Sequence, residues 1–317
     1  MATIALIIVN WNSGNCLNRC LEAVFAQSLA PDRIIVIDNL STDSSATGLA
    51  QSPKIKFIQS SRNLGFAVAN NIAIQQCNED FVALLNPDAY PRKDWLENLH
   101  QTIQSDPNIA ASGSVQLSAA NPLIIDGIGD VYHCTGLVWR CGYNEYLADV
   151  DLSKIKIFSA CAAAAIYRRS ALVEAGLFDE DFFCYVEDVD LGFRLRLLGY
   201  EIVRSNFAVV EHVGSYSTGG GRSDFSIFYG HRNVSWTFVK NLPFLLLIFL
   251  LPAHVLMSTV VFFHLLFAGK ALVFVRAKIA VFKGMKKILL KRKIVQSKRE
   301  ITYLELAKQM SWRIFRK

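Results

Sequence analysis

The sequence predicts an α/β protein built around a mainly parallel sheet. Short apolar runs alternate with segments of helical periodicity, which favours strands joined by right-handed helical crossovers. Polar residues follow these apolar runs, and the carboxyl ends of parallel strands meet at one edge, where open α/β sheets bind their ligands. We therefore expect a ligand site at this edge, near Asn10, Asp38, Asn63 and Asp88.

The first three strands are predicted from β-branched apolar runs. Residues 3–9 form the first run, and apolar side chains then recur at helical spacing from Leu17 to Phe25. Residues 34–37 and 55–58 predict the second and third strands, each followed by polar turn residues. A helix is expected from the turn after the third strand to about Gln76.

The fourth strand leads directly into an acidic turn. Phe81 to Leu85 is apolar throughout, as in a strand covered on both faces, and Pro87 ends it because proline has no N–H to donate. Asp88 would then lie just past the carboxyl end, where a carboxylate can hold a hard divalent cation against substrate phosphates. The alternative is an ordinary turn, with Asp88 as the N-cap of a helix at about 92–104.

A second acidic segment covers residues 178–191, where six carboxylates lie among aromatic side chains. The helical spacing that follows Leu191 places Glu187 and Asp188 at or near a helix N-terminus. An ionised carboxylate in an aromatic-walled pocket is a suitable general base for an alcohol. Helix capping is the alternative, but one carboxylate would be enough for that, so the cluster favours a functional site.

The segments around this acidic cluster give weaker signals. Residues 118–155 are irregular in pattern and are interpreted as an excursion on the substrate side. Residues 158–167 predict a strand closely packed by small side chains, and residues 207–210 predict a further strand that leads to His212. Taken alone, His212 fits either a buried core histidine or a metal ligand.

Composition excludes several classes of protein. The net charge of the 317 residues is +6, but residues from Lys270 onward carry +13 and the preceding residues −7, so nucleic-acid binding by the main domain is not favoured. The seven cysteines form no Cys-x-x-Cys pair, which suggests a reducing compartment, and the N-terminus lacks the features of a signal peptide. No glycine fingerprint follows the first strand, which disfavours a dinucleotide-dependent oxidoreductase.

Over about residues 3–240 the chain resembles family 2 glycosyltransferases of the inverting, nucleotide-sugar-dependent type, most closely the bacterial rhamnosyltransferase branch. Each motif alone is weak, but the ordered set is specific. The motifs are Ile8–Asn12, Val36–Asn39, Asn63–Phe66, Asn86–Asp88, Phe178–Glu180 with Phe183, Glu187–Leu191 and Glu211–His212.

The resemblance implies a GT-A-type, Rossmann-like catalytic domain at residues 1–240, and a role for each matched residue. Asp38 would bind the pyrimidine base, with Val9, Asn10 and Asn63 lining the nucleoside pocket. Asp88 would hold Mg²⁺ or Mn²⁺ against the donor diphosphate, and Asn86 stands where the family's Asp-x-Asp signature has its first Asp. His212 would complete the metal site, and Asp188, beside Glu187, would be the catalytic base.

The C-terminal region, residues 241–317, is predicted to associate with a membrane. Residues 242–269 contain no Lys, Arg, Asp or Glu, which is enough apolar length for one span and too little for two. One crossing would separate the catalytic domain from the basic tail, so we expect the segment to return near Pro252 or to lie in the interface, on the cytoplasmic face of the inner membrane.

The segment after it predicts an amphipathic helix. Its basic face is expected to contact anionic lipid, and the alternative is an apolar helical hairpin packed on the domain or in a dimer. The apolar face would carry Phe274, Val281, Met285 and Ile288, opposite Arg276, Lys283, Lys286 and Lys287.

Together these patterns predict an enzyme that transfers L-rhamnose from dTDP-rhamnose to a lipid-linked or polysaccharide acceptor. Two alternatives within the enzyme class are transfer of another hexose from a UDP- or GDP-sugar, and transfer directly to polyprenyl phosphate. A third alternative is a non-catalytic nucleotide-sugar-binding partner in a glycan assembly complex, which the retained Asp88, Glu187 and Asp188 argue against.

Overall fold

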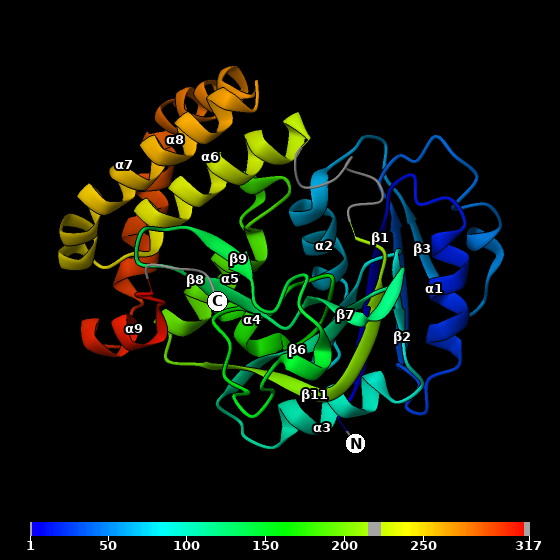
Figure 1. Cartoon of the computed structure of the whole chain (residues 1–317). Coiled ribbons are helices and arrows are strands. Elements are labelled where there is room, and N and C mark those ends of the chain that lie inside the picture. Colours follow the sequence, from blue (N-terminus) through cyan, green and yellow to red (C-terminus); the bar gives the residue numbers. More distant parts are fainter. Residues whose placement is uncertain (1, 215–222, 314–317) are drawn as a thin grey trace.

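The computed structural model describes residues 2–214 and 223–313. These residues form a nine-stranded sheet of order β3-β2-β1-β4-β10-β6-β11-β5, with β7 paired to β6, and a separate β8–β9 pair (Figure 1). Six of the nine strands run in one direction, which confirms the mainly parallel sheet. The strands are β1 Ile4–Asn10, β2 Arg33–Asp38, β3 Lys56–Gln59, β4 Phe81–Leu85, β5 Ala89–Pro91, β6 Ile109–Ser118, β7 Asn121–Gly127, β8 Asp130–Tyr132, β9 Val138–Arg140, β10 Ala164–Arg168 and β11 Glu201–His212.

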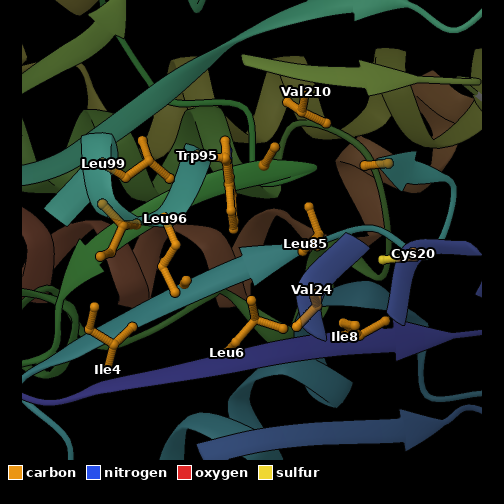
Figure 2. Packing of buried hydrophobic residues seen from close by; sticks show 14 of the residues in the cluster. Ile4, Leu6, Ile8, Cys20, Val24, Leu85, Trp95, Leu96, Leu99 and Val210 are labelled. Atoms are coloured by element: carbon orange, nitrogen blue, oxygen red, sulfur yellow. The ribbon is translucent and has the colours of Figure 1, made fainter. Parts of the chain in front are cut away.

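Helices cover both faces of the sheet, because alternate side chains of β1 point to opposite faces. Leu6 and its same-face neighbours pack against α1 and α3, as Figure 2 shows, whereas Ile7 packs toward α2, α4 and α5. The described helices are α1 Cys16–Phe25, α2 Gly65–Gln75, α3 Trp95–Gln104, α4 Arg169–Ala175, α5 Glu187–Leu197, α6 Asp224–Asn241, α7 Phe244–Phe267, α8 Ala271–Ser297 and α9 Tyr303–Gln309, with short 3-10 turns at Leu49–Gln51, Leu147–Asp149 and Glu180–Phe182.

The first four strands match their predicted positions and run parallel to one another. All five residues of β4 are buried, as expected for a strand covered on both faces. Helix α3 begins at Trp95 after its N-cap Asp94, so the interpretation of Asp88 as the cap of this helix is wrong. Asp88 lies in the turn between β4 and β5.

The carboxyl-terminal half of the sheet departs from a simple parallel order. Strand β10 is shorter than the predicted strand at 158–167 and runs antiparallel between β4 and β6. Residues 118–155, which looked irregular, contain β7, β8 and β9. Strand β11 extends over twelve residues and ends at His212, which brings this side chain to the same edge as Asp88.

A layer of three helices, α6, α7 and α8, lies to one side of the sheet (Figure 1). Helices α6 and α8 pack along each other, through Trp236 of α6 with Val281 and Ile288 of α8. The predicted domain boundary at residues 240 and 241 falls at the end of α6. Across it, Leu242 and Leu250 share one apolar cluster with Phe193 of α5, so the C-terminal region packs directly on the helix that carries Glu187 and Asp188.

Helix α7 is continuous through Pro252, so the expected return near this proline is wrong. The chain reverses after Phe267, where Gly269 has a φ of 71°, and α8 then runs back along α7. Phe262 lies beside Phe274, and Lys278 donates to Ser258, as an antiparallel pair requires. Among the described helices, α7 alone is long and apolar enough to cross a membrane, and only 6% of its most apolar 18-residue window is buried.

The faces of α8 also differ from the expectation. Phe274, Val281 and Ile288 are buried against the rest of the protein, so this apolar face packs on the domain, as the alternative of a packed helical hairpin predicted. A second set of apolar side chains on α8 faces outward. Because both faces of the helix are apolar, the periodicity of the sequence does not show which face is buried. We call the exposed apolar side chains of both helices the hairpin surface; its most exposed members are Phe244, Leu245, Phe249, Leu256, Phe267, Leu272, Phe282 and Ile294.

Candidate active site

A cavity of about 720 Å³ lies at the carboxyl ends of β1 and β4. Its wall brings together the two acidic segments that the sequence singled out, with Asp88 after β4 and Asp188 on α5. His212 joins them from the end of β11. The cavity thus lies at the edge of the sheet that was predicted to bind a ligand.

The nucleoside end of the cavity contains only some of the expected residues. Val9 and Asn63 line the wall, as predicted. Asn10 and Asp38 are buried outside the lining set, where the Asn10 amide donates to the Asp38 carboxylate at 2.8 Å. Asp38 also accepts from Gln59 at 2.7 Å, so both side chains tie strand ends together, and the contact of Asp38 with a pyrimidine base stays a prediction.

Asn39 is a wall residue that received no role from the sequence. Its side-chain NH₂ group donates to Asn63 Oδ1 at 2.9 Å, and its side-chain oxygen Oδ1 accepts from the Leu64 N–H at 2.7 Å. The turn that precedes α2 is therefore bound to the end of β2. Trp11, from the loop after β1, lines the same region.

A chain of charged groups connects Asp88 to the substrate-side excursion. The Nε2 atom of His212 lies 3.3 Å from Asp88, and its Nδ1 atom lies 2.8 Å from Asp126 Oδ2. The same Asp126 oxygen lies 2.5 Å from the Arg140 guanidinium. Burial alone would lower the pKa of His212, but Asp126 and Asp88 outweigh it and raise this pKa to about 8.

Asp88 and His212 form the pair that fits a divalent metal ion. The His212 and Arg140 partners hold the pKa of Asp126 below its usual range in spite of burial, so Asp126 is an acceptor and Nδ1 of His212 carries the hydrogen. Nε2 is buried and lies 3.3 Å from Asp88 Oδ1, so a metal ion could lie between these two atoms in place of a proton. One carboxylate and one imidazole, completed by phosphate oxygens and water, suit Mn²⁺ or Mg²⁺.

Asn86 precedes this pair and is held by the neighbouring strand. Its backbone N–H donates to the Ala163 carbonyl at 2.8 Å, just before β10, and its side chain lines the cavity. The Asn86 side chain is an amide and adds no negative charge. The turn therefore offers a metal ion one carboxylate, Asp88, whereas an Asp-x-Asp signature offers two.

The first turn of α5 presents Glu187 and Asp188 to the cavity, as the sequence predicted. Backbone N–H groups of Ala162 and Val189 donate to the two Asp188 oxygens at 3.2 and 2.8 Å. Burial nevertheless raises the pKa of Asp188, which moves it toward the range of a general base at neutral pH.

Glu187 lies beside Asp188 in the same helical turn and is buried. Burial, and then the Asp188 charge, raise the pKa of Glu187 well above its usual range. Its Oε2 atom is buried without a partner among the described residues. The geometry therefore favours Asp188, whose two oxygens are held by backbone N–H groups, as the base.

Sequence reasoning missed Asp126, Asp130 and Arg140 as members of the site. Asp130 accepts from Ser159 at 2.9 Å, and burial and the Asp188 charge raise its pKa to about 8. Two carboxylates at either end of a glycine-rich segment were a visible signal for Asp126 and Asp130. Arg140 gave no signal, because the β8–β9 register, which pairs it with Asp130, brings it to the site.

Known structures identify the class of the fold. A mannosyltransferase from Pyrobaculum calidifontis, solved with GDP-Man and Mn²⁺, aligns with a TM-score of 0.57 at 15% identity, over 93% of this chain and 87% of that one. The sheet, with a cavity at its carboxyl edge, is a GT-A fold, the architecture of nucleotide-sugar-dependent transferases.

Sequence comparison then identifies the family. Residues 5–176 match the description "Glycosyl transferase family 2", and the chain belongs to this family of enzymes, in its rhamnosyltransferase-like branch. The N-acetylglucosaminyl-diphospho-decaprenol L-rhamnosyltransferase of Mycobacterium tuberculosis is 26% identical over 270 residues, which cover 75% of this chain and 84% of that protein. The O-antigen chain rhamnosyltransferase RfbN of Salmonella typhimurium is 28% identical over 231 residues, 71% of this chain and 70% of that protein.

Proposed function

We propose that the protein transfers L-rhamnose from dTDP-rhamnose, with inversion, to a lipid-linked or polysaccharide acceptor in cell-surface glycan synthesis. One observation carries the proposal: a single cavity contains a metal-type pair, Asp88 and His212, and a separate carboxylate, Asp188, suited to act as a base. The names of two relatives support rhamnose as the sugar.

In this proposal Asp188 accepts the proton of an acceptor hydroxyl while that oxygen attacks the anomeric carbon from the face opposite the nucleotide. Burial raises the pKa of Asp188, which makes it a stronger base than an exposed carboxylate. The new C–O bond forms as the bond to the diphosphate oxygen breaks, and the nucleoside diphosphate leaves with the bonding electrons.

Asp88 and His212 would hold a Mg²⁺ or Mn²⁺ ion against the donor diphosphate. When bound, such an ion supplies positive charge that stabilises the departing diphosphate. The chain itself orients His212, since Asp126 fixes its ring and Arg140 fixes Asp126. Val9, Trp11, Asn39 and Asn63 would hold the nucleoside.

The test is release of nucleoside diphosphate by detergent-solubilised, full-length protein. A panel of dTDP-, UDP- and GDP-sugars is offered with Mg²⁺, Mn²⁺ or chelator, and membrane lipid extract serves as acceptor. We expect release from dTDP-rhamnose, and its loss on chelation.

Release of nucleoside diphosphate from a UDP- or GDP-hexose instead would show that the proposed donor is wrong and would leave the proposed mechanism unchanged. Sugar found only on polyprenyl phosphate would show that the proposed acceptor is wrong. Tight donor binding without release from any sugar would contradict the enzymatic proposal and favour a non-catalytic partner. Release that persists in chelator would contradict the metal part alone.

We also propose that the hairpin surface docks the protein on the cytoplasmic face of an anionic membrane. Exposed aromatic and aliphatic side chains of this size are expected at membrane contacts. Arg276, Lys283, Lys286 and Lys293 are exposed on α8 among them and complement anionic headgroups.

The packing of α8 along α7 and α6 argues against a single crossing, because α7 would have to separate from both helices. A C-terminal tag should therefore be accessible from the cytoplasmic side. A tag accessible only from outside the cell would contradict this topology.

A further inference from the structure

The loop that leads into α5 has an unusual backbone. Phe183, Tyr185 and Val186 have φ values of 66°, 67° and 69°, in the left-handed region, and none of them is glycine. Each such residue costs about 1–2 kcal/mol, and the cost is largest for a β-branched side chain such as Val186. A loop with this much strain keeps its shape only if its surroundings hold it.

Asn233 of α6 makes the contacts that hold this loop. Its side chain is fully buried, and its Nδ2 atom donates to the carbonyl oxygens of Phe182, Cys184 and Tyr185, at 3.0, 3.0 and 2.7 Å. The two hydrogens of one NH₂ group therefore serve three backbone carbonyls within four residues, one hydrogen being shared between two of them. Buried carbonyls that lose such a donor are costly, by about 1–3 kcal/mol each.

Arg232 fixes the orientation of that amide. Its Nε atom donates to Asn233 Oδ1 at 2.9 Å, which leaves the NH₂ end of the amide facing the loop. Its Nη2 atom donates to the carbonyl oxygens of Asp181 and Phe182, both at 2.9 Å. The two neighbouring residues of α6 thus form one clamp on residues 181–185.

The clamped loop touches both ends of the active site. The Phe183 carbonyl accepts from the backbone N–H groups of Phe66 and Ala67, at 2.7 and 3.3 Å, in the first turn of α2. This turn follows Asn63 in the cavity wall, and a Cβ on Gly65 would lie 2.6 Å from Phe183. At its other end the loop supplies Val186, the N-cap of α5, directly before Glu187 and Asp188.

We propose that Asn233 is a positioning residue for Asp188: it holds the strained loop so that the carboxylate faces the acceptor hydroxyl. This inference rests on the proposed function, in which Asp188 is the base. Asn233 contacts no substrate in this role, since its amide is used entirely by the loop and by Arg232.

The test compares Asn233→Asp with Thr237→Val in the full-length protein. The first change keeps the size but replaces the donating NH₂ group by an acceptor oxygen. Thr237 is equally buried one turn further along α6, and its hydroxyl has no partner among the described residues, so Thr237→Val is the matched control. Hydrogen exchange, kcat and donor KM are measured for both.

For Asn233→Asp we expect faster exchange in peptides covering residues 182–188 and unchanged exchange in β1. We expect kcat to fall about 100-fold, within the range of a lost general base, while donor KM changes less than about threefold. Water that reaches Asp188 would reduce the burial that raises its pKa, so the acidic limb of kcat/KM should move to lower pH.

Arg232→Lys is the second variant, in case Asn233→Asp does not fold. It keeps the positive charge and loses the fork that orients the amide, so the same pattern is expected with a loss of about tenfold in kcat. Unchanged loop exchange, a kcat within threefold of the control, or a donor KM that rises in step with the loss of kcat would each overturn the inference.

The wild-type protein distinguishes this inference from the proposed function. Absence of transfer by wild type with every donor would refute the proposed function itself. Transfer by wild type that Asn233→Asp retains would refute the positioning role alone.

Discussion

The cavity edge of the sheet and the hairpin surface are both unusual, in opposite ways: the edge buries polar and charged side chains, and the hairpin surface exposes apolar ones. The edge buries groups that are normally exposed to water, among them Asp130, Glu187 and His212, each no more than 6% exposed. The hairpin surface exposes groups that the core normally keeps, such as Phe249 at 73% and Phe267 at 89%. Both arrangements are unfavourable for an isolated folded chain, and they are the basis of the two proposals, a polar substrate at the edge and a membrane contact at the hairpin.

The largest effect is expected from Asp188→Asn, which removes the base from the edge and leaves its shape. Transfer should fall about 10³-fold or more, because proton transfer by a positioned group contributes 10²- to 10⁴-fold. Nucleoside diphosphate binding, followed through the fluorescence of Trp11 and Trp139 in the cavity wall, should stay unchanged. Retained turnover would remove Asp188 from its proposed role, and Asp151→Asn, at an exposed site, is the control.

The second effect is expected at the hairpin surface, where Phe249→Ser and Leu256→Ser are combined. Each side chain contributes about 1.5–3 kcal/mol when buried in an apolar phase, so partition onto anionic vesicles should fall about 100-fold or more. The free energy of unfolding should change by less than about 0.5 kcal/mol, because both side chains face solvent. Leu123→Ser, at an equally exposed site outside the hairpin, should not affect vesicle binding.

The comparison between edge and hairpin would fail if the double variant bound vesicles like wild type. It would also fail if the double variant unfolded as easily as a core variant such as Leu99→Ala, for which a loss of about 2–5 kcal/mol is expected.

A smaller effect is expected from Asp126→Asn, which tests the support behind the metal pair. Without the carboxylate that holds Nδ1–H of His212, the Mn²⁺ dissociation constant in the presence of nucleoside diphosphate should rise about 10- to 100-fold. Titration calorimetry measures this without any turnover. Asp149→Asn, which is exposed, should leave Mn²⁺ binding unchanged, and an equal loss in both variants would argue against Asp126 as a support.

The smallest effect is expected from Asp130→Asn, on stability against pH. The pKa of Asp130 is raised from 3.8 to about 8, so the folded state binds this proton more tightly than the unfolded state. Wild-type stability should therefore fall as pH rises from about 4 to 8 through this group. The variant should lose less stability between pH 5 and pH 8, by about 1 kcal/mol or more in urea unfolding. Parallel pH curves for the two proteins would contradict the raised pKa.

The two regions also differ in how far the sequence predicts them. In β1 and β4 every residue is buried or nearly so, and continuous apolar runs such as Phe81–Leu85 identify their strands directly. In α8 apolar residues surround much of the helix, and only packing on Trp236 decides that Val281 faces inward and Phe282 outward. Periodicity predicts the helix but leaves its orientation open.

The site follows the same division. Asp88 and Asp188 were predicted because each follows a recognisable local pattern, a strand end or a helix start. Arg140 depends on strand pairing over a distance, and Asn233 depends on the packing of α6 against a loop nearly fifty residues earlier in the chain. Neither contact can be predicted from the neighbouring residues in the sequence.

The capping of α2 by the Phe183 carbonyl has a consequence for synthesis. Gly65 and Phe66 leave the ribosome long before Phe183, and Asn233, which holds the capping loop, follows another fifty residues later. A nascent chain with a complete amino-terminal sheet therefore still lacks the cap on its nucleotide-side helix. The order of synthesis thereby delays a finished loop, and with it the placement of Asp188, until α6 has been made.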